Sequence, residues 1–200
     1  MVMIKMDPLN IPEDALKEYT IKVDVHGFEF INQDNFSEII IKKPGMLSKE
    51  YAVLEGESAI GKLKYDTVKM KTEIYDDSGD ILLGTIEKPE PQNKIFNPFD
   101  PKGISKVREY LVEDPAGKVT MKTVSEKATH TIELIYNVVD ESGVVARFEP
   151  PQKIFGRQEY HLHIYLQKLR PIMLAALFLS IRMGEMAFAA GNVRDAFYPF

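Results

Sequence analysis

Four lysines lie close together in the stretch GKLKYDTVKMKTE, residues 61–73, of a chain whose formal net charge is −5. The stretch contains two strand-like runs, and each run presents two lysines on one face. If the runs pair as a hairpin around residues 65–67, four ammonium groups gather in an otherwise acidic protein. The alternative is an ordinary solvated lysine face. The four candidate side chains are Lys62, Lys64, Lys69 and Lys71.

A second pattern with chemical potential combines histidine and glutamate. Glu159, His161 and His163 alternate along one strand-like run and face the same side, and imidazole and carboxylate groups are common metal ligands. Two histidines from one strand do not complete a site, and they lie opposite the apolar face of the run. His26 and His130 belong to separate strands and would join them only if the fold brought them near. We therefore interpret the pattern as a solvated strand face and predict no metal.

The remaining chemical motifs are weak. The stretch DDSGD at residues 76–80 faintly resembles a calcium loop, but it lacks the spaced oxygens and the distal glutamate of an EF-hand. A tight hairpin turn with Gly79 at a positive φ explains it fully. No P-loop, G-x-S-x-G or G-x-G-x-x-G motif occurs. We predict no catalytic residue and no cofactor, and hence a protein that is not an enzyme.

The composition sets outer limits on function. The chain has 200 residues, of which 44% are hydrophobic and 28% charged, as in an ordinary folded protein. Its acidic balance argues against nucleic-acid binding, which needs a surplus of basic side chains. The chain has no cysteine, which excludes disulfides, thiolate nucleophiles and cysteine-based zinc sites. We expect a cytoplasmic location, because the first 18 residues contain no apolar signal-peptide core before Asp7.

The elements that must position these residues are short strands. From Tyr19 to Leu166 the sequence alternates between apolar and polar residues and is interrupted by turn residues. Three similar hairpins predict an antiparallel meander. The predicted hairpins cover 72–86, 105–123 and 131–148, and further strands are predicted at 19–25, 37–43, 50–54 and 160–166.

Residues 88–102, KPEPQNKIFNPFDPK, contain four prolines and break the strand pattern. The segment is either a linker between two domains or a long surface connection within one sheet. We favour the connection, because hairpins of one style lie on both sides of it and neither half has a complete core alone.

The stretch PIMLAALFLSIRMGEMAFAA, residues 171–190, decides how the sheet is covered. Its uninterrupted apolar part runs only from Pro171 to Ile181, whereas a membrane span needs about 20 residues. Arg182 and Glu185 follow and would be costly inside a bilayer. A sheet with one apolar face must bury it, and this helix is the only partner in the chain. We predict a closed antiparallel barrel threaded by the helix.

The order of these elements resembles a known family. Three hairpins, the strand YHLHIYL and then the helix PIMLAALFLSIRMGE are similar to the tubby C-terminal-like superfamily, which includes tubby proteins, phospholipid scramblases and LURP-one-related proteins. The resemblance implies a β-barrel of roughly twelve strands around a central helix that is a protein core. Calcium-driven scrambling is not expected, because the segment from Gly156 to Arg170 is basic and the chain has no cysteine. Tubby domains bind phosphoinositides through basic side chains, so the resemblance implies an anionic-lipid or phosphate site at the four lysines.

We therefore expect an N-terminal extension at 1–18, a tubby-like barrel at 19–190 with its helix at 171–190, and a tail at 191–200. The expected function is a non-enzymatic binding or scaffold module, cytoplasmic or peripheral at a membrane, for an anionic phospholipid or a protein partner. The alternatives are a tail-anchored or scramblase-like membrane protein with 171–190 in the bilayer, and an enzyme that uses the histidines. If the helix is a core, four side chains are inaccessible to water and two charged ones lie near the barrel mouth. The buried set is Leu174, Leu177, Phe178 and Ile181, and the charged pair is Arg182 and Glu185.

Overall fold

The structure is a computed structural model. It describes residues 11–24, 26–45, 48–87, 111–113, 121–127, 134–151 and 159–197. The proline-rich segment 88–102, the predicted turn at 113–117 beyond its first residue, and His130 lie outside the described residues.

Twelve strands and one helix form from the described residues. They are β1 (Lys17–Asp24), β2 (Gly27–Asn32), β3 (Ser37–Lys42), β4 (Glu50–Glu55), β5 (Ser58–Asp66), β6 (Lys71–Tyr75), β7 (Leu82–Glu87), β8 (Leu111–Glu113), β9 (Met121–Lys127), β10 (Leu134–Asp140), β11 (Gly143–Glu149), β12 (Glu159–Ile164) and α1 (Pro171–Phe197). The mainly β class with one C-terminal helix is confirmed.

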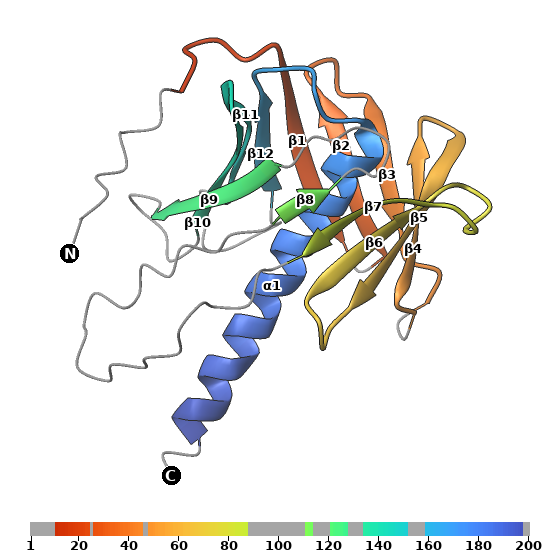
Figure 1. Ribbon diagram of the computed structural model, residues 1–200, viewed down its shortest axis with the longest axis vertical. Coiled ribbons are helices and arrows are strands. Elements are labelled where there is room, and N and C mark those ends of the chain that lie inside the picture. Colours follow the sequence, from red (N-terminus) through yellow and green to blue (C-terminus); the bar gives the residue numbers. More distant parts are fainter. Residues whose placement is uncertain are drawn as a thin grey trace.

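The strands form one antiparallel sheet that curves around α1 (Figure 1). Each strand pairs with the next in sequence, and β12 pairs with β1, with Lys17 opposite Ile164. The pairing is shortest at β8, where two residue pairs join it to β9: Leu111 with Lys122, and Val112 with Met121. Apolar side chains of alternate strand positions face inward because the side-chain period of a strand is two.

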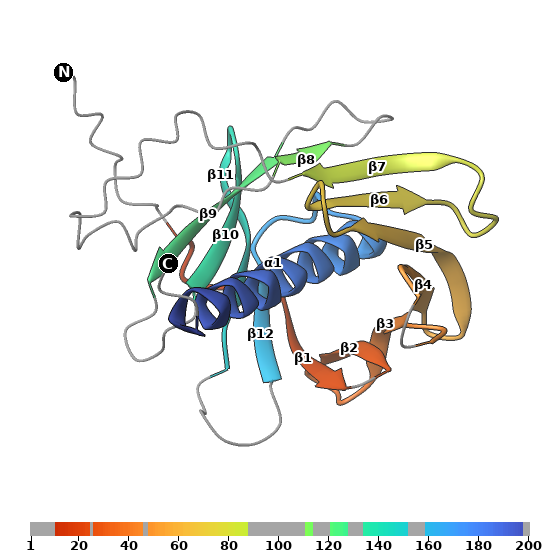
Figure 2. The same ribbon diagram turned by 90° about the horizontal axis from the view of Figure 1, so that it is seen from below.

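The core lies between this sheet and α1 (Figure 2). Phe178 has no exposed surface and its ring meets those of Phe28, Phe30, Phe148 and Tyr160. The helix is apolar around its whole circumference in this region, which is what a helix surrounded by strands requires. The predicted burial is confirmed for Leu174, Leu177, Phe178 and Ile181, none of which is more than 3% exposed.

Because neighbouring strands are antiparallel, successive turns alternate between two ends of the sheet. We call the end where α1 begins the start end; it holds the turns after β2, β4, β6 and β10. The opposite exit end holds the turns after β1, β3 and β5. Near the exit end the hydroxyl of Thr72 lies 2.6 Å from that of Ser180, and Arg182 donates a hydrogen bond to the Tyr160 hydroxyl. The side chain of Glu185 lies outside the described residues.

The fold differs from the sequence-based expectation in one additional strand and in the bounds of two elements. Strand β2 was not predicted, because the alternation Phe28-Glu29-Phe30 is short and follows a turn of only two residues. Strand β1 begins at Lys17, inside the expected extension 1–18, since its pairing with β12 extends to that residue. Helix α1 continues to Phe197 through most of the expected tail, because no proline occurs before Pro199 to stop it.

Candidate binding surface

The four candidate lysines belong to a hairpin. Strands β5 and β6 pair with Lys64 opposite Glu73 and Asp66 opposite Lys71. The turn between them is held by the Asp66 carboxylate, which accepts the backbone N–H groups of Val68 and Lys69. These hydrogen bonds lower the pKa of Asp66. The hairpin is therefore present, but its turn lies at residues 67–70 and not at 65–67. The prediction that Lys69 and Lys71 share a strand face is wrong, because Lys69 lies in the turn.

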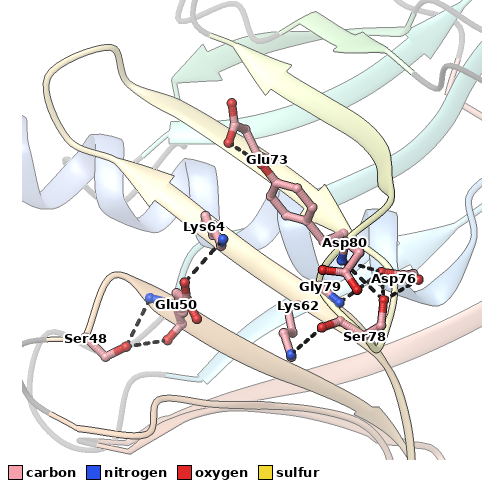
Figure 3. Close-up of polar contacts among 10 residues, drawn as sticks. Ser48, Glu50, Lys62, Lys64, Glu73, Asp76, Ser78, Gly79 and Asp80 are labelled. Atoms are coloured by element: carbon pink, nitrogen blue, oxygen red, sulfur yellow. Dashed lines mark hydrogen bonds and ion pairs between the residues drawn. The ribbon is translucent and has the colours of Figure 1, made fainter.

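Lys62 is tied to the next turn of the chain. Its ammonium group donates a hydrogen bond of 2.9 Å to the backbone oxygen of Ser78 (Figure 3). Its stem crosses Gly79, where a Cβ atom would lie 3.1 Å from the Lys62 nitrogen. Gly79 has a φ of +87°, so both its conformation and the lysine stem favour glycine.

Lys64 lies between an acidic and an aromatic neighbour. Its ammonium group is 3.3 Å from Glu50 of β4 (Figure 3) and 4.8 Å from the centre of the Tyr75 ring. The Tyr75 hydroxyl donates to Glu73, and this hydrogen bond raises the pKa of Tyr75. The group as a whole is a mixed row of charges on the outer face of the sheet.

The other two lysines differ sharply from each other. Lys71 lies 2.7 Å from Glu87 of β7 and 3.8 Å from Glu73. Lys69 is exposed at the turn, and within the described part of the chain its ammonium group has no hydrogen-bond or ion-pair partner. The sequence pattern missed Glu50 and Glu87 because they come from neighbouring strands, and only the strand register could have placed them.

The DDSGD stretch forms a tight turn, as expected. One carboxylate oxygen of Asp76 accepts the backbone N–H groups of Gly79 and Asp80 (Figure 3) and also that of Ile81. The backbone hydrogen bonds, that of Ile81 first, and the Ser78 hydroxyl lower the pKa of Asp76. The hydrogen bonds of its own turn therefore occupy the Asp76 carboxylate.

The histidine pattern makes contacts with neighbouring strands. The Nδ1 atom of His163 lies 3.0 Å from Glu18 of β1, and its Nε2 atom lies 3.9 Å from Glu149 of β11. Hydrogen bonds from Gln33 and His163 lower the pKa of Glu18. Within the described part of the chain, no three histidine, aspartate or glutamate side chains are placed to hold one metal ion. Of the other histidines, His26 lies in the exit-end turn after β1.

The comparisons with known proteins add a likeness of fold. No protein-family model matches the chain, and no curated protein matches it. The X-ray structure of the Arabidopsis thaliana protein AT5G01750 is similar at a TM-score of 0.54 and 11% identity, covering 86% of this chain and 91% of that one. That protein has the LURP-one-related, tubby-like fold, so the expected relationship is supported for the fold alone. Among the described residues no helix is both long and apolar enough to cross a bilayer.

Proposed function

We propose that the chain is a tubby-like, LURP-one-related barrel whose twelve-strand wall closes around α1, and that it acts as a non-enzymatic binding or scaffold module. Its ligand is an anionic surface, with an anionic phospholipid as the first candidate and an acidic protein partner as the second. In this proposal the protein works in the cytoplasm and attaches peripherally to membranes.

One observation carries the proposal: the inside of the sheet is filled by α1. The helix side chains from Ile172 to Ile181 are buried against inward-facing strand residues, so the centre of the fold is core. Recognition then takes place on the outer face and at the ends, where charged side chains lie. Lysines on those surfaces are attracted to anionic lipid by about 1 kcal/mol each.

The ion pairs of the hairpin lysines do not prevent such binding. Lys64 and Glu50 are 40% and 53% exposed, and exposed ion pairs contribute only about 0–1 kcal/mol. A phosphate group can therefore replace a glutamate as the partner of a lysine at small cost. Lys62, Lys64, Lys69 and Lys71 are accordingly our first set of candidate contacts.

Vesicle flotation tests the lipid proposal. The full chain is mixed at low salt with neutral phosphatidylcholine vesicles and with vesicles that also contain a phosphoinositide. We expect flotation only with the anionic vesicles, and release as salt rises, because screening shortens the range of the attraction to about 8 Å at physiological ionic strength. Absence of flotation at low salt, where the attraction is strongest, would rule out lipid as the ligand.

A further inference from the structure

In the turns that the structure describes, the two ends of the sheet carry opposite charge. In the described turns of the start end, acidic side chains dominate, and three lysines reach them with partners: Lys17 with Glu38, Lys168 with Asp140, and Lys62 with the Ser78 carbonyl. The remaining basic residue is Arg170, which directly precedes α1. Its guanidinium group donates a hydrogen bond to the Leu83 carbonyl. The acidic residues of these turns are Asp34, Glu55, Glu57, Asp76, Asp77, Asp80, Asp140 and Glu141.

The exit end is basic in the turns that the structure describes. Lys42 and Lys49 flank the connection from β3 to β4, and Lys69 lies in the turn from β5 to β6. All three are exposed, and among the described residues their ammonium groups make no hydrogen bond or ion pair. Lys49 and Lys69 lie near enough to Asp66 to help lower its pKa. Lys43 also lies in the first connection, 5.9 Å from the Tyr51 ring centre, and Arg182 leaves the core at the same end.

Four of the acidic groups described near the exit end already have hydrogen-bond or ion-pair partners. Asp24 and Asp66 accept backbone N–H groups of their own turns. Glu50 and Glu87 pair with Lys64 and Lys71. The ion pairs compensate Glu50 and Glu87, whereas Asp24 and Asp66 keep their negative charge. Four lysines of the two connections outnumber these two aspartates: Lys42, Lys43, Lys49 and Lys69.

Both ends expose apolar side chains, but among the described residues only the exit end places one beside a lysine that makes no ion pair. At the start end the exposed apolar side chains lie beside the acidic turns, and they are Leu16, Phe36, Ile81 and Leu82. Val68, next to Lys69 at the hairpin tip, is 90% exposed, and Met186 of α1 is 51% exposed. Helix α1 emerges from the sheet at this end and continues beyond it (Figure 1). Lysines spread over two connections around an exposed apolar tip suit a broad surface with an anionic polar layer and an apolar layer beneath it.

We propose that the exit end is the docking face of the protein on an anionic membrane surface, with Lys42, Lys49 and Lys69 as the main electrostatic contacts and Val68 at the contact layer. This inference rests on the proposed lipid-binding function and names the face that carries it. The acidic start end points away from the membrane, because like charges repel it. The protein thus binds in one orientation.

Single-cysteine labelling tests the orientation, because the full chain has no cysteine of its own. An environment-sensitive fluorophore is attached to Val68→Cys at the exit end and, as the matched control, to Phe36→Cys at the start end, where the side chain is 61% exposed. With phosphoinositide vesicles we expect a blue shift at position 68 and none at position 36. A shift at position 36 alone, or equal shifts, would overturn the docking face.

Two triple variants of equal charge test the contacts. The exit-end variant carries Lys42→Gln, Lys49→Gln and Lys69→Gln. We expect it to lose on the order of 100-fold in vesicle partitioning, since each lysine near an anionic surface is worth about 1 kcal/mol. The control replaces three basic residues of the start end, and we expect it to lose less than about 5-fold, because that end points away from the membrane. A loss in the control as large as that of the exit-end variant would overturn the docking face. The control substitutions are Lys17→Gln, Lys168→Gln and Arg170→Gln.

The outcomes separate this inference from the proposed function. If wild-type protein floats with anionic vesicles but the exit-end label and variants do not respond, the lipid-binding proposal is supported and the docking face is refuted. If wild-type protein does not float, both the lipid ligand and the docking face are refuted. A third arm uses poly-glutamate peptide: a response of the Val68→Cys label to the peptide and not to vesicles would overturn the membrane proposal in favour of an acidic protein.

Discussion

Replacing Phe178 with alanine should unfold the protein far more easily, because this side chain lies at the centre of the core. Its ring centroid is 5.1 Å from that of Tyr160 and 5.2 Å from that of Phe28, both edge to face. Phe30 lies at 5.8 Å and Phe148 at 6.1 Å. The five rings come from β2, β11, β12 and α1, so the cavity left by Phe178→Ala would touch four elements.

The magnitude follows from the burial and the rings. A buried Phe→Ala change costs about 3–5 kcal/mol, and each aromatic pair adds roughly 0.5–1.5 kcal/mol beyond its buried area. Since Phe178 is fully buried and contacts four rings, we expect the upper end, about 5 kcal/mol. That is a large part of the 5–15 kcal/mol typical of a folded domain. For a chain of this length the melting temperature should fall by roughly 10–20 °C.

Urea denaturation followed by circular dichroism, without detergent, measures the effect. The control Phe36→Ala removes a ring that is 61% exposed and should change the free energy of unfolding by less than about 0.5 kcal/mol. A helix that inserted into a bilayer would give a different result, since Phe178→Ala would then weaken membrane attachment and leave the strands folded. A loss below about 1.5 kcal/mol would refute the reasoning that α1 is the core of this fold.

Three further predictions concern packing and pH. Ser180→Ala should cost about 1–3 kcal/mol in the free energy of unfolding, because it leaves the buried Thr72 hydroxyl without a partner; adding Thr72→Val should recover part of the loss, and no recovery would contradict the account. Gly61→Ala should lower the melting temperature, because its Cβ would lie 2.2 Å from a methyl carbon of Ile172 and 2.4 Å from the Tyr75 carbonyl oxygen; an unchanged melting temperature would contradict this packing. Burial raises the pKa of Tyr19 to about 12, above its unfolded value of about 10, so its neutral form stabilises the fold below pH ~10 and this stabilisation is lost as the pH rises through about 12. Tyrosinate absorbance during alkaline unfolding, compared with Tyr19→Phe, checks the effect, and identical alkaline unfolding would count against it.

The alternation of apolar residues was enough to predict most strands and the role of α1. It failed at β2, because only two residues, Val25 and His26, separate this strand from β1. The sequence contains a signal for that turn: Asp24 accepts the backbone N–H groups of His26 and Gly27, at 2.6 and 2.9 Å. An aspartate two or three residues before a glycine is typical of such turns, and weighing it would have separated the strands.

The binding surface was harder to predict than the fold. Alternation placed Lys62 and Lys64 on one face correctly, but it could not supply the glutamates of β4 and β7 that pair with the hairpin lysines. Those contacts depend on the register between strands, which local pattern leaves undetermined. The opposite charge of the two ends has another origin. It is readable from the turns in sequence order once the strands are taken as consecutive and antiparallel.

Turn formation alone does not explain this separation of charge. Both ends use an aspartate to hold a turn: Asp76 and Asp140 at the start end, and Asp24 and Asp66 at the exit end. If turns were the only requirement, the two ends would be equally acidic. The difference comes from extra carboxylates that hold no turn at one end, and from exposed lysines at the other. The positive N-terminus of α1 lies at the acidic end, where the helix dipole is favourably placed, but that effect fades within a turn of the helix. Exposed, unpartnered lysines stabilise a fold very little, so their concentration at one end is better explained by what that end binds.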